Sequence, residues 1–217
     1  MKTRRFVAAA AAIVSLTASS SVFASPLTVS SYDMANGSTG AYNYWDDSYS
    51  GSGSKTTDFA ALFGGKGDLT DGIKATDNWN VTEAPAGAGP YVGWLNLNPV
   101  IHFHFGAPVT INGISFNFDD ANGFGGVSTP LSVIVGGTTY AVADPVGTAP
   151  FQFDLTGLGL TVSDLDITLN RRNNWVFVSE ISFDDGRPGG GSVSEPGALA
   201  LLGLGLAGLV SSRRRKC

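Results

Sequence analysis

Two histidines separated by one residue, His102 and His104, have the residue type and the spacing of metal ligands. They belong to the alternating stretch 101–105, so on a β-strand both rings project from the same face, about 7 Å apart. This geometry permits a shared zinc or copper ion, but no third ligand lies near them in the sequence. We favour the alternative, in which the two rings form an exposed polar face opposite the apolar residues of the stretch.

The remaining residues that could carry out catalysis do not form a recognisable set. Adjacent carboxylates occur at 46–47, 119–120 and 184–185, but neighbours on a strand point to opposite sides, so none alone makes a glycosidase pair. The sequence contains no discernible nucleophile–base pair and no G-x-S-x-G turn, and its only cysteine is Cys217 at the end of the chain. We therefore predict that the protein is not an enzyme.

Two groups of side chains could instead bind a ligand without reacting with it. One is a cluster of aromatic residues in a Gly- and Ser-rich segment, where flat rings could stack on the C–H faces of sugars. The other combines the only basic pair of the acidic middle of the chain with an amide, which offers planar donors to hydroxyls or carboxylates. The candidates are Tyr42, Tyr44, Trp45 and Tyr49 in the first group, and Arg171, Arg172 and Asn174 in the second.

Each group also has a purely structural explanation. The aromatic rings could cap one end of a β-sandwich, and the basic pair could form a solvated hairpin tip. We expect Trp175, the next residue along the chain, to belong to the core.

The elements that must position these residues are expected to be strands. Between residues 25 and 190 no stretch shows a convincing 3.6-residue apolar period, whereas apolar residues recur at every second position. Strands separated by Gly, Pro and Asp predict an all-β sandwich, and we expect the polar segment 30–93 to consist of loops with one strand at its start. The alternating stretches are 101–105, 111–118, 131–135, 139–142, 151–155, 165–169 and 175–183.

The charge distribution excludes one class of partner. All 18 acidic residues and only six of the 13 basic residues lie between residues 25 and 196, which gives this part of the chain a net charge of −12. Nucleic acids bind to basic surfaces, so we expect no nucleic-acid partner. Bound divalent cations would relieve the mutual repulsion of these acids.

Both ends of the chain indicate export. A positive stretch, the apolar core 6–16 and small residues ending at Ala24 are typical of a signal peptide, which we expect signal peptidase to cleave after Ala24. At the other end, the flexible linker 187–194 precedes an apolar run at 198–210 and a basic cluster that is costly to move across a bilayer. That cluster is formed by Arg213, Arg214, Arg215 and Lys216.

The C-terminal order of Glu195 and Pro196, a short apolar helix and the arginines resembles the PEP-CTERM sorting signal of Gram-negative bacteria. Ser194 stands where the first proline of that motif usually lies. The resemblance implies recognition by an exosortase-type transpeptidase, transient anchoring in the inner membrane, and delivery to the cell surface or extracellular matrix. The expected organisation is a signal peptide (1–24), a β-sandwich domain (25–186), a linker (187–194) and a sorting signal with a transmembrane helix (195–217).

A second resemblance covers residues 29–185. An Asp-Gly turn within 68–72 precedes Asn78 and Trp79, and a late strand has the sequence Trp-Val-Phe-Val-Ser-Glu-Ile over 175–181. This order resembles the galactose-binding-like jelly roll, which discoidin-type domains share with many non-catalytic carbohydrate-binding modules. The resemblance implies a jelly-roll β-sandwich.

In that family the Asp-Gly turn and the glutamate of the final strand meet around a structural calcium ion, which implies Asp68, Asp71 and Glu180 as ligands here. Calcium prefers about six to eight oxygen ligands. Alternation along the final strand places Glu180 on the face of Val176 and Val178, opposite the aromatic residues, and a carboxylate covered on that face needs a cation or donors. The alternative is that the two aspartates only form turns and Glu180 faces water.

From these observations we expect an exported, surface-sorted protein that binds carbohydrate non-catalytically. Its partner would be extracellular polysaccharide, and one structural Ca²⁺ would be its only cofactor. The alternative is a structural protein of the extracellular matrix or envelope that has no specific small ligand.

Overall fold

Apolar residues at alternating positions form most of the nine strands in the part of the chain that the structure describes, residues 24–83 and 89–188. In this computed structural model the strands are β1 (Ala24–Leu27), β2 (Ser31–Ala35), β3 (Ala61–Gly65), β4 (Val92–Leu95), β5 (Val100–Phe118), β6 (Ser132–Val135), β7 (Thr138–Ala141), β8 (Phe151–Asn170) and β9 (Trp175–Pro188). Between them lie two 3-10 turns, Asp68–Thr70 and Phe124–Gly126, and the short helix α1 (Trp79–Thr82).

The expected export and sorting segments cannot be compared with this fold. The signal peptide up to residue 23, the linker from residue 189 and the C-terminal helix lie outside the described residues. Within the ranges 24–83 and 89–188, no helix has the length and apolar character needed to cross a membrane.

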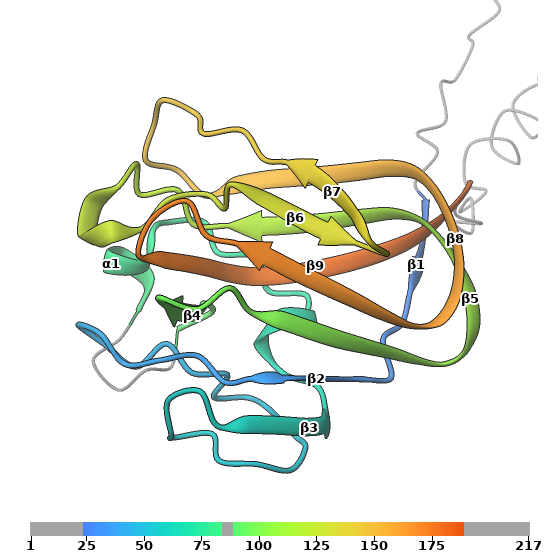
Figure 1. Ribbon diagram of the computed structural model, residues 1–217, viewed down its shortest axis with the longest axis horizontal. Helices are drawn as coiled ribbons and strands as arrows, with labels where there is room; N and C mark the ends of the chain where they lie inside the picture. The colour runs from blue at the N-terminus through green and yellow to red at the C-terminus, as the bar shows by residue number, and fades with distance from the viewer. Residues whose placement is uncertain (1–23, 84–88, 189–217) are drawn as a thin grey trace, which may run out of the picture.

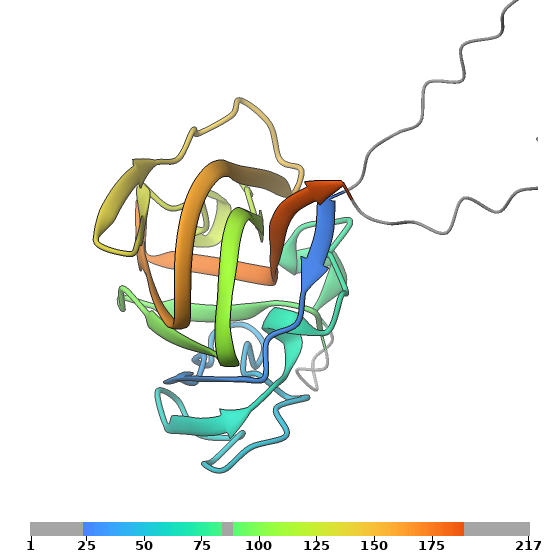
Figure 2. The same ribbon diagram turned by 90° about the vertical axis from the view of Figure 1, so that its right-hand side faces the viewer.

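Two long strands, β5 and β8, give the molecule its two layers because each runs through both of them (Figures 1 and 2). The first half of β5 pairs with the second half of β8 and with β2, whereas its second half pairs with the first half of β8 and with β9. The pairing with β8 is interrupted between His104 and Val109, where Gly106 has a φ of 74° that favours glycine. The antiparallel sheet folds over at this bend, and the predicted all-β sandwich is confirmed.

Two short strands pair with the edge of β9 that β5 leaves open. β4 pairs at the start of β9, next to Trp175, and β1 pairs at its end, next to Pro188. Figure 1 shows the two ends of β9 on opposite sides of the molecule, with α1 near its start and β1 near its end.

The segment 30–93 differs from the expectation of a single strand. It begins with β2, as predicted, but it also contains β3, and β4 starts at Val92. In β3 the only buried apolar side chain is Leu62, while Phe63 is 55% exposed. No alternation of apolar residues therefore marks this strand in the sequence.

Apolar side chains from both layers meet in one core. Phe103 of β5 and Phe183 of β9 are both buried, and their ring centroids lie 5.0 Å apart in an edge-to-face arrangement. Phe116 on the second half of β5 is stacked on Phe118, at 5.5 Å. Burial of this apolar surface, at roughly 25 cal/mol per Å², is the main force that holds the two layers together.

A β-bulge in β9 corrects the predicted faces of this strand. Asn117 of β5 is opposite Glu180, and Phe118 is opposite Val178, so Ser179 is an extra residue in the ladder. Beyond the bulge the alternation is shifted by one position. Val176, Val178, Ile181 and Phe183 consequently face the main core, whereas Trp175, Phe177 and Glu180 share the other face.

Ser179 allows a direct test of this register. We expect its deletion to abolish cooperative unfolding in urea, because one half of β9 would then turn its apolar side chains away from the core. Ser179→Ala keeps the register and removes the bonds of the hydroxyl to Asn117 Oδ1 and to the Ala75 N–H, so it should cost only about 1–3 kcal/mol. A deletion variant as stable as the parent would contradict the assigned bulge.

Candidate functional site

Aromatic side chains gather at the start of β9, at the end of the sandwich that is remote from both described chain ends (Figure 1). They surround a cavity of about 210 Å³, which we call the aromatic hollow. Its walls come from β9, α1 and two loops that the sequence separates widely. The lining residues are Gly40, Ala41, Tyr44, Trp79, Gly125, Val127, Trp175 and Phe177.

Phe177 is the centre of this aromatic cluster. Its ring centroid lies 4.6 Å from that of Tyr44 and 5.2 Å from that of Trp175, and all three rings are at least nine-tenths buried. Trp79 lies nearly parallel to Phe177 at 6.4 Å, and on its other side it stacks on Phe124 at 6.0 Å. Phe124 is 62% exposed, so the buried cluster continues into a solvent-accessible aromatic rim.

Two glycines keep the aromatic hollow open. A Cβ atom on Gly40 would lie 2.8 Å from Cζ2 of Trp175, and one on Gly125 would lie 2.6 Å from Cζ2 of Trp79. Gly125 also has a φ of 64°, which side chains rarely adopt. Any larger residue at either position would push against an aromatic wall.

The basic pair next to the aromatic hollow is engaged in loop contacts. The guanidinium of Arg171 donates to the Oδ1 atoms of Asn96 and Asn98, and that of Arg172 donates to backbone carbonyls, including that of Val142 at 2.7 Å. Both guanidinium groups thus hold loops in place, and a direct role of Arg171 and Arg172 in ligand recognition stays a prediction. Asn174 is exposed and lies against Gly126, beside the turn that carries Phe124.

The aromatic residues of the segment 42–49 separate into two places. Tyr42 and Tyr44 join the aromatic hollow, where their centroids are 6.3 Å apart. Tyr49 is buried on the other side, where its hydroxyl accepts a hydrogen bond from the Gly65 N–H, and Trp45 donates from Nε1 to Asp58. Tyr44 is buried in the aromatic cluster and Tyr49 in the main core, so only Tyr42 and Tyr44 of the four lie at the hollow, and a ligand role for any of the four stays a prediction.

Four residues of this site were not predicted to bind a ligand. Trp175 and Phe177 belong to an alternating stretch that predicts core positions, and Phe124 and Trp79 lie outside any alternating stretch. Gly123, Gly125 and Gly126 around Phe124 were the one available signal, because closely spaced glycines predict a turn, and turns usually lie at the surface.

Two buried carboxylates support α1, which carries Trp79. Asp119 accepts a hydrogen bond from the Trp79 N–H at 2.6 Å, and Glu83 accepts one from the Tyr91 N–H at 3.1 Å. The second oxygen of each carboxylate is buried and has no hydrogen-bond partner in the part of the chain that the structure describes. Burial raises the pKa of Asp119 to about 7 and that of Glu83 to about 8.

The residues implied as calcium ligands lie at a different place. The N–H of Gly72 donates to Glu180 Oε2 at 3.0 Å, so the Asp-Gly turn and β9 do meet, beside a cavity of about 280 Å³. Burial raises the pKa of Glu180 to about 7. Asp68 is directed elsewhere, because its carboxylate accepts bonds from Ser48 Oγ and the Asp47 N–H.

The stability of the protein should fall as the pH rises. A carboxyl whose pKa is raised on folding holds its proton more tightly in the folded state, so its contribution is full at acidic pH and is lost between the unfolded pKa near 4 and the folded pKa near 7 or 8. We expect urea unfolding to show a loss of several kcal/mol between pH 5 and pH 8, because each group contributes up to about 1.4 kcal/mol per pH unit in this range. Asp119→Asn and Glu83→Gln should flatten this slope, whereas Asp77→Asn, at an exposed position, should not. If the pH dependence of stability is unchanged in both Asp119→Asn and Glu83→Gln, the raised pKa values of these two carboxyls would be refuted.

Comparison with known proteins identifies one end of the chain. Residues 192–216 match the PEP-CTERM protein-sorting motif, and no curated protein matches the chain. Among solved structures, a truncated AlyQ with CBM32 and alginate lyase domains is 14% identical with a TM-score of 0.34, over 54% of this chain and 28% of that one.

Two smaller structures are matched over most of their own length. The CBM32 of AlyQ in complex with 4,5-unsaturated mannuronic acid is 13% identical with a TM-score of 0.32, over 51% of this chain and 91% of that one. The family 32 CBM of C. perfringens NanJ in complex with galactose is 8% identical with a TM-score of 0.31, over 50% and 88%. Similarity of this extent carries no information about function. The chain is thus an all-β sandwich domain followed, at residues 192–216, by a PEP-CTERM protein-sorting motif.

Proposed function

We propose that this protein is exported, sorted to the cell surface, and binds carbohydrate non-catalytically at the aromatic hollow. The observation that carries the proposal is the continuous aromatic surface from the buried Phe177 through Trp79 to the exposed Phe124. Aromatic faces are well suited to the C–H faces of sugar rings, and a rigid ring loses little entropy when it binds.

Polar groups beside the aromatic rim support recognition of hydroxyls. Asn173 and Asn174 are exposed, and their amides lie next to Gly123 and Gly126 in the turn that carries Phe124. An amide both donates and accepts, as a sugar hydroxyl does. An apolar platform with a few amides at its edge fits a neutral or weakly charged polysaccharide.

The carboxylates nearest to the aromatic hollow do not support hydrolysis. Asp119 and Glu83 are 0% and 5% exposed, and each accepts a backbone N–H beneath Trp79. A general acid or base must come within hydrogen-bond distance of the bond that it cleaves. These two groups instead fix the platform on which a sugar would stack.

The PEP-CTERM motif supports export followed by processing by an exosortase-type transpeptidase near Glu195 and Pro196. We propose that signal peptidase cleaves after Ala24 and that the C-terminal helix anchors the protein in the inner membrane before processing. Ala24 pairs with Pro188, so the described domain begins and ends on the side away from the start of β9 and the aromatic hollow (Figure 1). This arrangement would leave the hollow accessible to extracellular polysaccharide.

A structural calcium ion between the Asp-Gly turn and β9 is part of the same proposal. Asp71 and Glu180 would hold the ion, because both border the same cavity, together with the buried hydroxyl oxygen of Thr70 that has no hydrogen-bond partner within residues 24–83 and 89–188. Calcium would place a positive charge beside the buried carboxylate of Glu180, which has no ion-pair partner among the described residues. The ion would also connect the Asp-Gly turn to β9. We leave Asp68 out of this ligand set, because its carboxylate accepts hydrogen bonds from Ser48 Oγ and the Asp47 N–H.

Binding at the aromatic hollow can be tested with matched variants. Phe124→Ala and Trp79→Ala should weaken binding to polysaccharide from the producing organism, measured by affinity electrophoresis, roughly two- to tenfold for each lost stacking contact. Phe63→Ala removes an exposed aromatic ring of β3 outside the hollow and should leave binding unchanged. Equal loss in this control, or no binding to any glycan on an array, would contradict the proposal and favour a structural matrix protein.

The calcium proposal predicts a response to chelation. Metal-stripped protein should melt several degrees higher when Ca²⁺ is added, because an ion that binds only the folded state at a hundredfold excess over its Kd stabilises by about 2.7 kcal/mol. Glu180→Gln keeps the acceptor for the Gly72 N–H but removes the charge, and should abolish most of this shift. Asp185→Asn, on the same strand, is the control. Identical melting curves with and without Ca²⁺ would exclude the site.

A further inference from the structure

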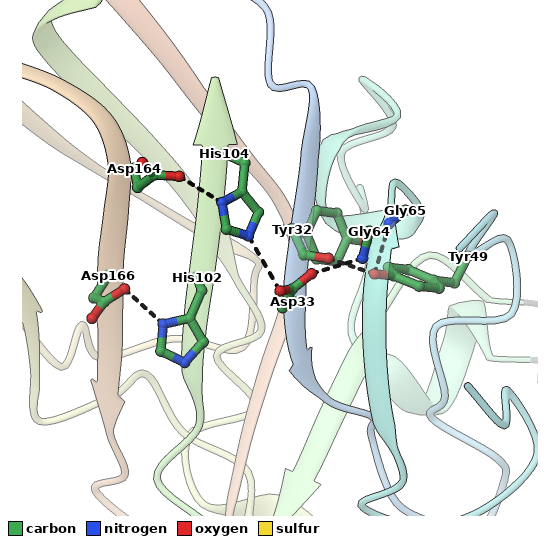
Figure 3. A network of polar contacts seen from close by, with 9 residues as sticks. All are labelled: Tyr32, Asp33, Tyr49, Gly64, Gly65, His102, His104, Asp164 and Asp166. Carbon is green, nitrogen blue, oxygen red and sulfur yellow. Dashed lines mark hydrogen bonds and ion pairs between the residues drawn. The ribbon is translucent and has the colours of Figure 1, made fainter. Parts of the chain in front are cut away.

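Five titratable side chains lie close together on β2, β5 and β8, in two bonded groups (Figure 3). His102 contacts Asp166, and His104 contacts both Asp164 and Asp33. Strand register brings them together, because Asp33 of β2 is opposite His102 of β5, and His102 and His104 are opposite Asp166 and Asp164 of β8. Their neighbours along each strand point into the core. β2 thus places a third oxygen- or nitrogen-bearing side chain, Asp33, beside the two histidines, although it lies far from them in the sequence.

Each histidine is already held in the way that metal-binding histidines are held. Nδ1 of His102 lies 2.6 Å from Asp166 Oδ1, and Nδ1 of His104 lies 2.6 Å from Asp164 Oδ1. A carboxylate at Nδ1 fixes the proton on that nitrogen, which leaves the lone pair of Nε2 for a cation at His102. At His104, Nε2 faces the Asp33 carboxylate, so a cation would have to displace the proton that they share. Nε2 of His102 makes no hydrogen bond to any described residue, and the side chain is 48% exposed.

The remaining contact has the dimensions of a metal site. Nε2 of His104 lies 3.2 Å from Asp33 Oδ2. Two ligands that are each about 2.0–2.1 Å from a tetrahedral zinc ion are separated by about 3.3 Å. The nitrogen and the oxygen thus stand at almost the separation that a shared zinc ion requires.

The local charge also favours a cation. Three carboxylates flank the two imidazoles, and within the described chain their only ion-pair partners are these histidines. No lysine or arginine of the described residues pairs with Asp33, Asp164 or Asp166. A dication would reduce the repulsion among these groups in an already acidic domain.

We propose that Asp33, His102 and His104 bind a divalent transition-metal ion of the zinc class, which replaces the hydrogen bond between His104 and Asp33. Asp164 and Asp166 are positioning residues that orient the two rings. In the arrangement that residues 24–83 and 89–188 adopt here, no three such side chains already surround a common centre. Binding requires Nε2 of His102 to approach Asp33, its cross-strand partner, while Nδ1 keeps its contact with Asp166.

The site is open on its solvent side, so a water molecule would complete the tetrahedron. It lies on the outer face of β2, β5 and β8, apart from the aromatic hollow and from the Asp71–Glu180 turn. The two metal proposals can therefore be distinguished by ion type, because imidazole nitrogens favour zinc and copper over calcium.

The test uses the full chain without a histidine tag, in which His102 and His104 are the only histidines, and with Cys217→Ser to remove the only thiol. Titration calorimetry of metal-stripped protein with Zn²⁺ should show one equivalent bound, with tighter binding at pH 8 than at pH 6 because protons compete for the imidazoles. Ca²⁺ should not compete. Cu²⁺ bound at the same site should show two nitrogen ligands by electron paramagnetic resonance.

Variants separate the ligands from the positioning residues. His104→Ala and Asp33→Asn should each weaken Zn²⁺ binding at least tenfold, and Asp164→Asn should weaken it about 10- to 100-fold without removing a nitrogen from the Cu²⁺ spectrum. Asp154→Asn, an exposed carboxylate elsewhere on β8, is the matched control and should change nothing. Absence of Zn²⁺ binding, or binding that survives both ligand variants with the melting temperature unchanged, would overturn the proposal.

Discussion

The pairing of β9 with β5 around the extra residue Ser179 determines what each half of β9 contributes. Beyond the bulge, Ile181 and Phe183 fill the space between the two layers. Before it, Trp175 and Phe177 turn outward and form the floor of the aromatic hollow. At the bulge itself, Glu180 reaches the turn at Gly72. Because the register of β9 shifts once at Ser179, this strand contributes side chains to the core, to the aromatic hollow and to the contact with the Gly72 turn.

The aromatic hollow balances favourable stacking against buried charge. Each aromatic pair contributes about 0.5–1.5 kcal/mol beyond its burial, and Phe177 takes part in several of them. A buried oxygen without a partner costs about 1–3 kcal/mol, and Asp119 and Glu83 each leave one such oxygen among the described residues. A buried negative charge would cost more than an unpaired oxygen, and protonation of Asp119 and Glu83 removes that charge. The position of Trp79 is consequently sensitive to pH, because its N–H is held by Asp119.

The sequence predicted the fold class because alternation is a local property that a single strand displays. It could not reveal the bulge, since one inserted residue leaves the apolar content of β9 unchanged and only alters the face. The separation of Tyr44 from Trp45 and Tyr49 was equally hidden, because loops without alternation give no indication of direction. Asp33 lies 71 residues from His104, and only the antiparallel pairing of β2 with β5 brings them together.

The placement of the two ends of β9 also has a mechanical consequence. Trp175 lies at the aromatic hollow, and Pro188 lies beside Ala24 where the described chain ends. A pulling force between a ligand in the hollow and the C-terminal end of the domain would act along β9, perpendicular to its hydrogen bonds with β5, β4 and β1. Such a load shears many bonds at once instead of peeling them one by one. The domain is therefore built to resist extension along the axis that joins its hollow to its C-terminal end.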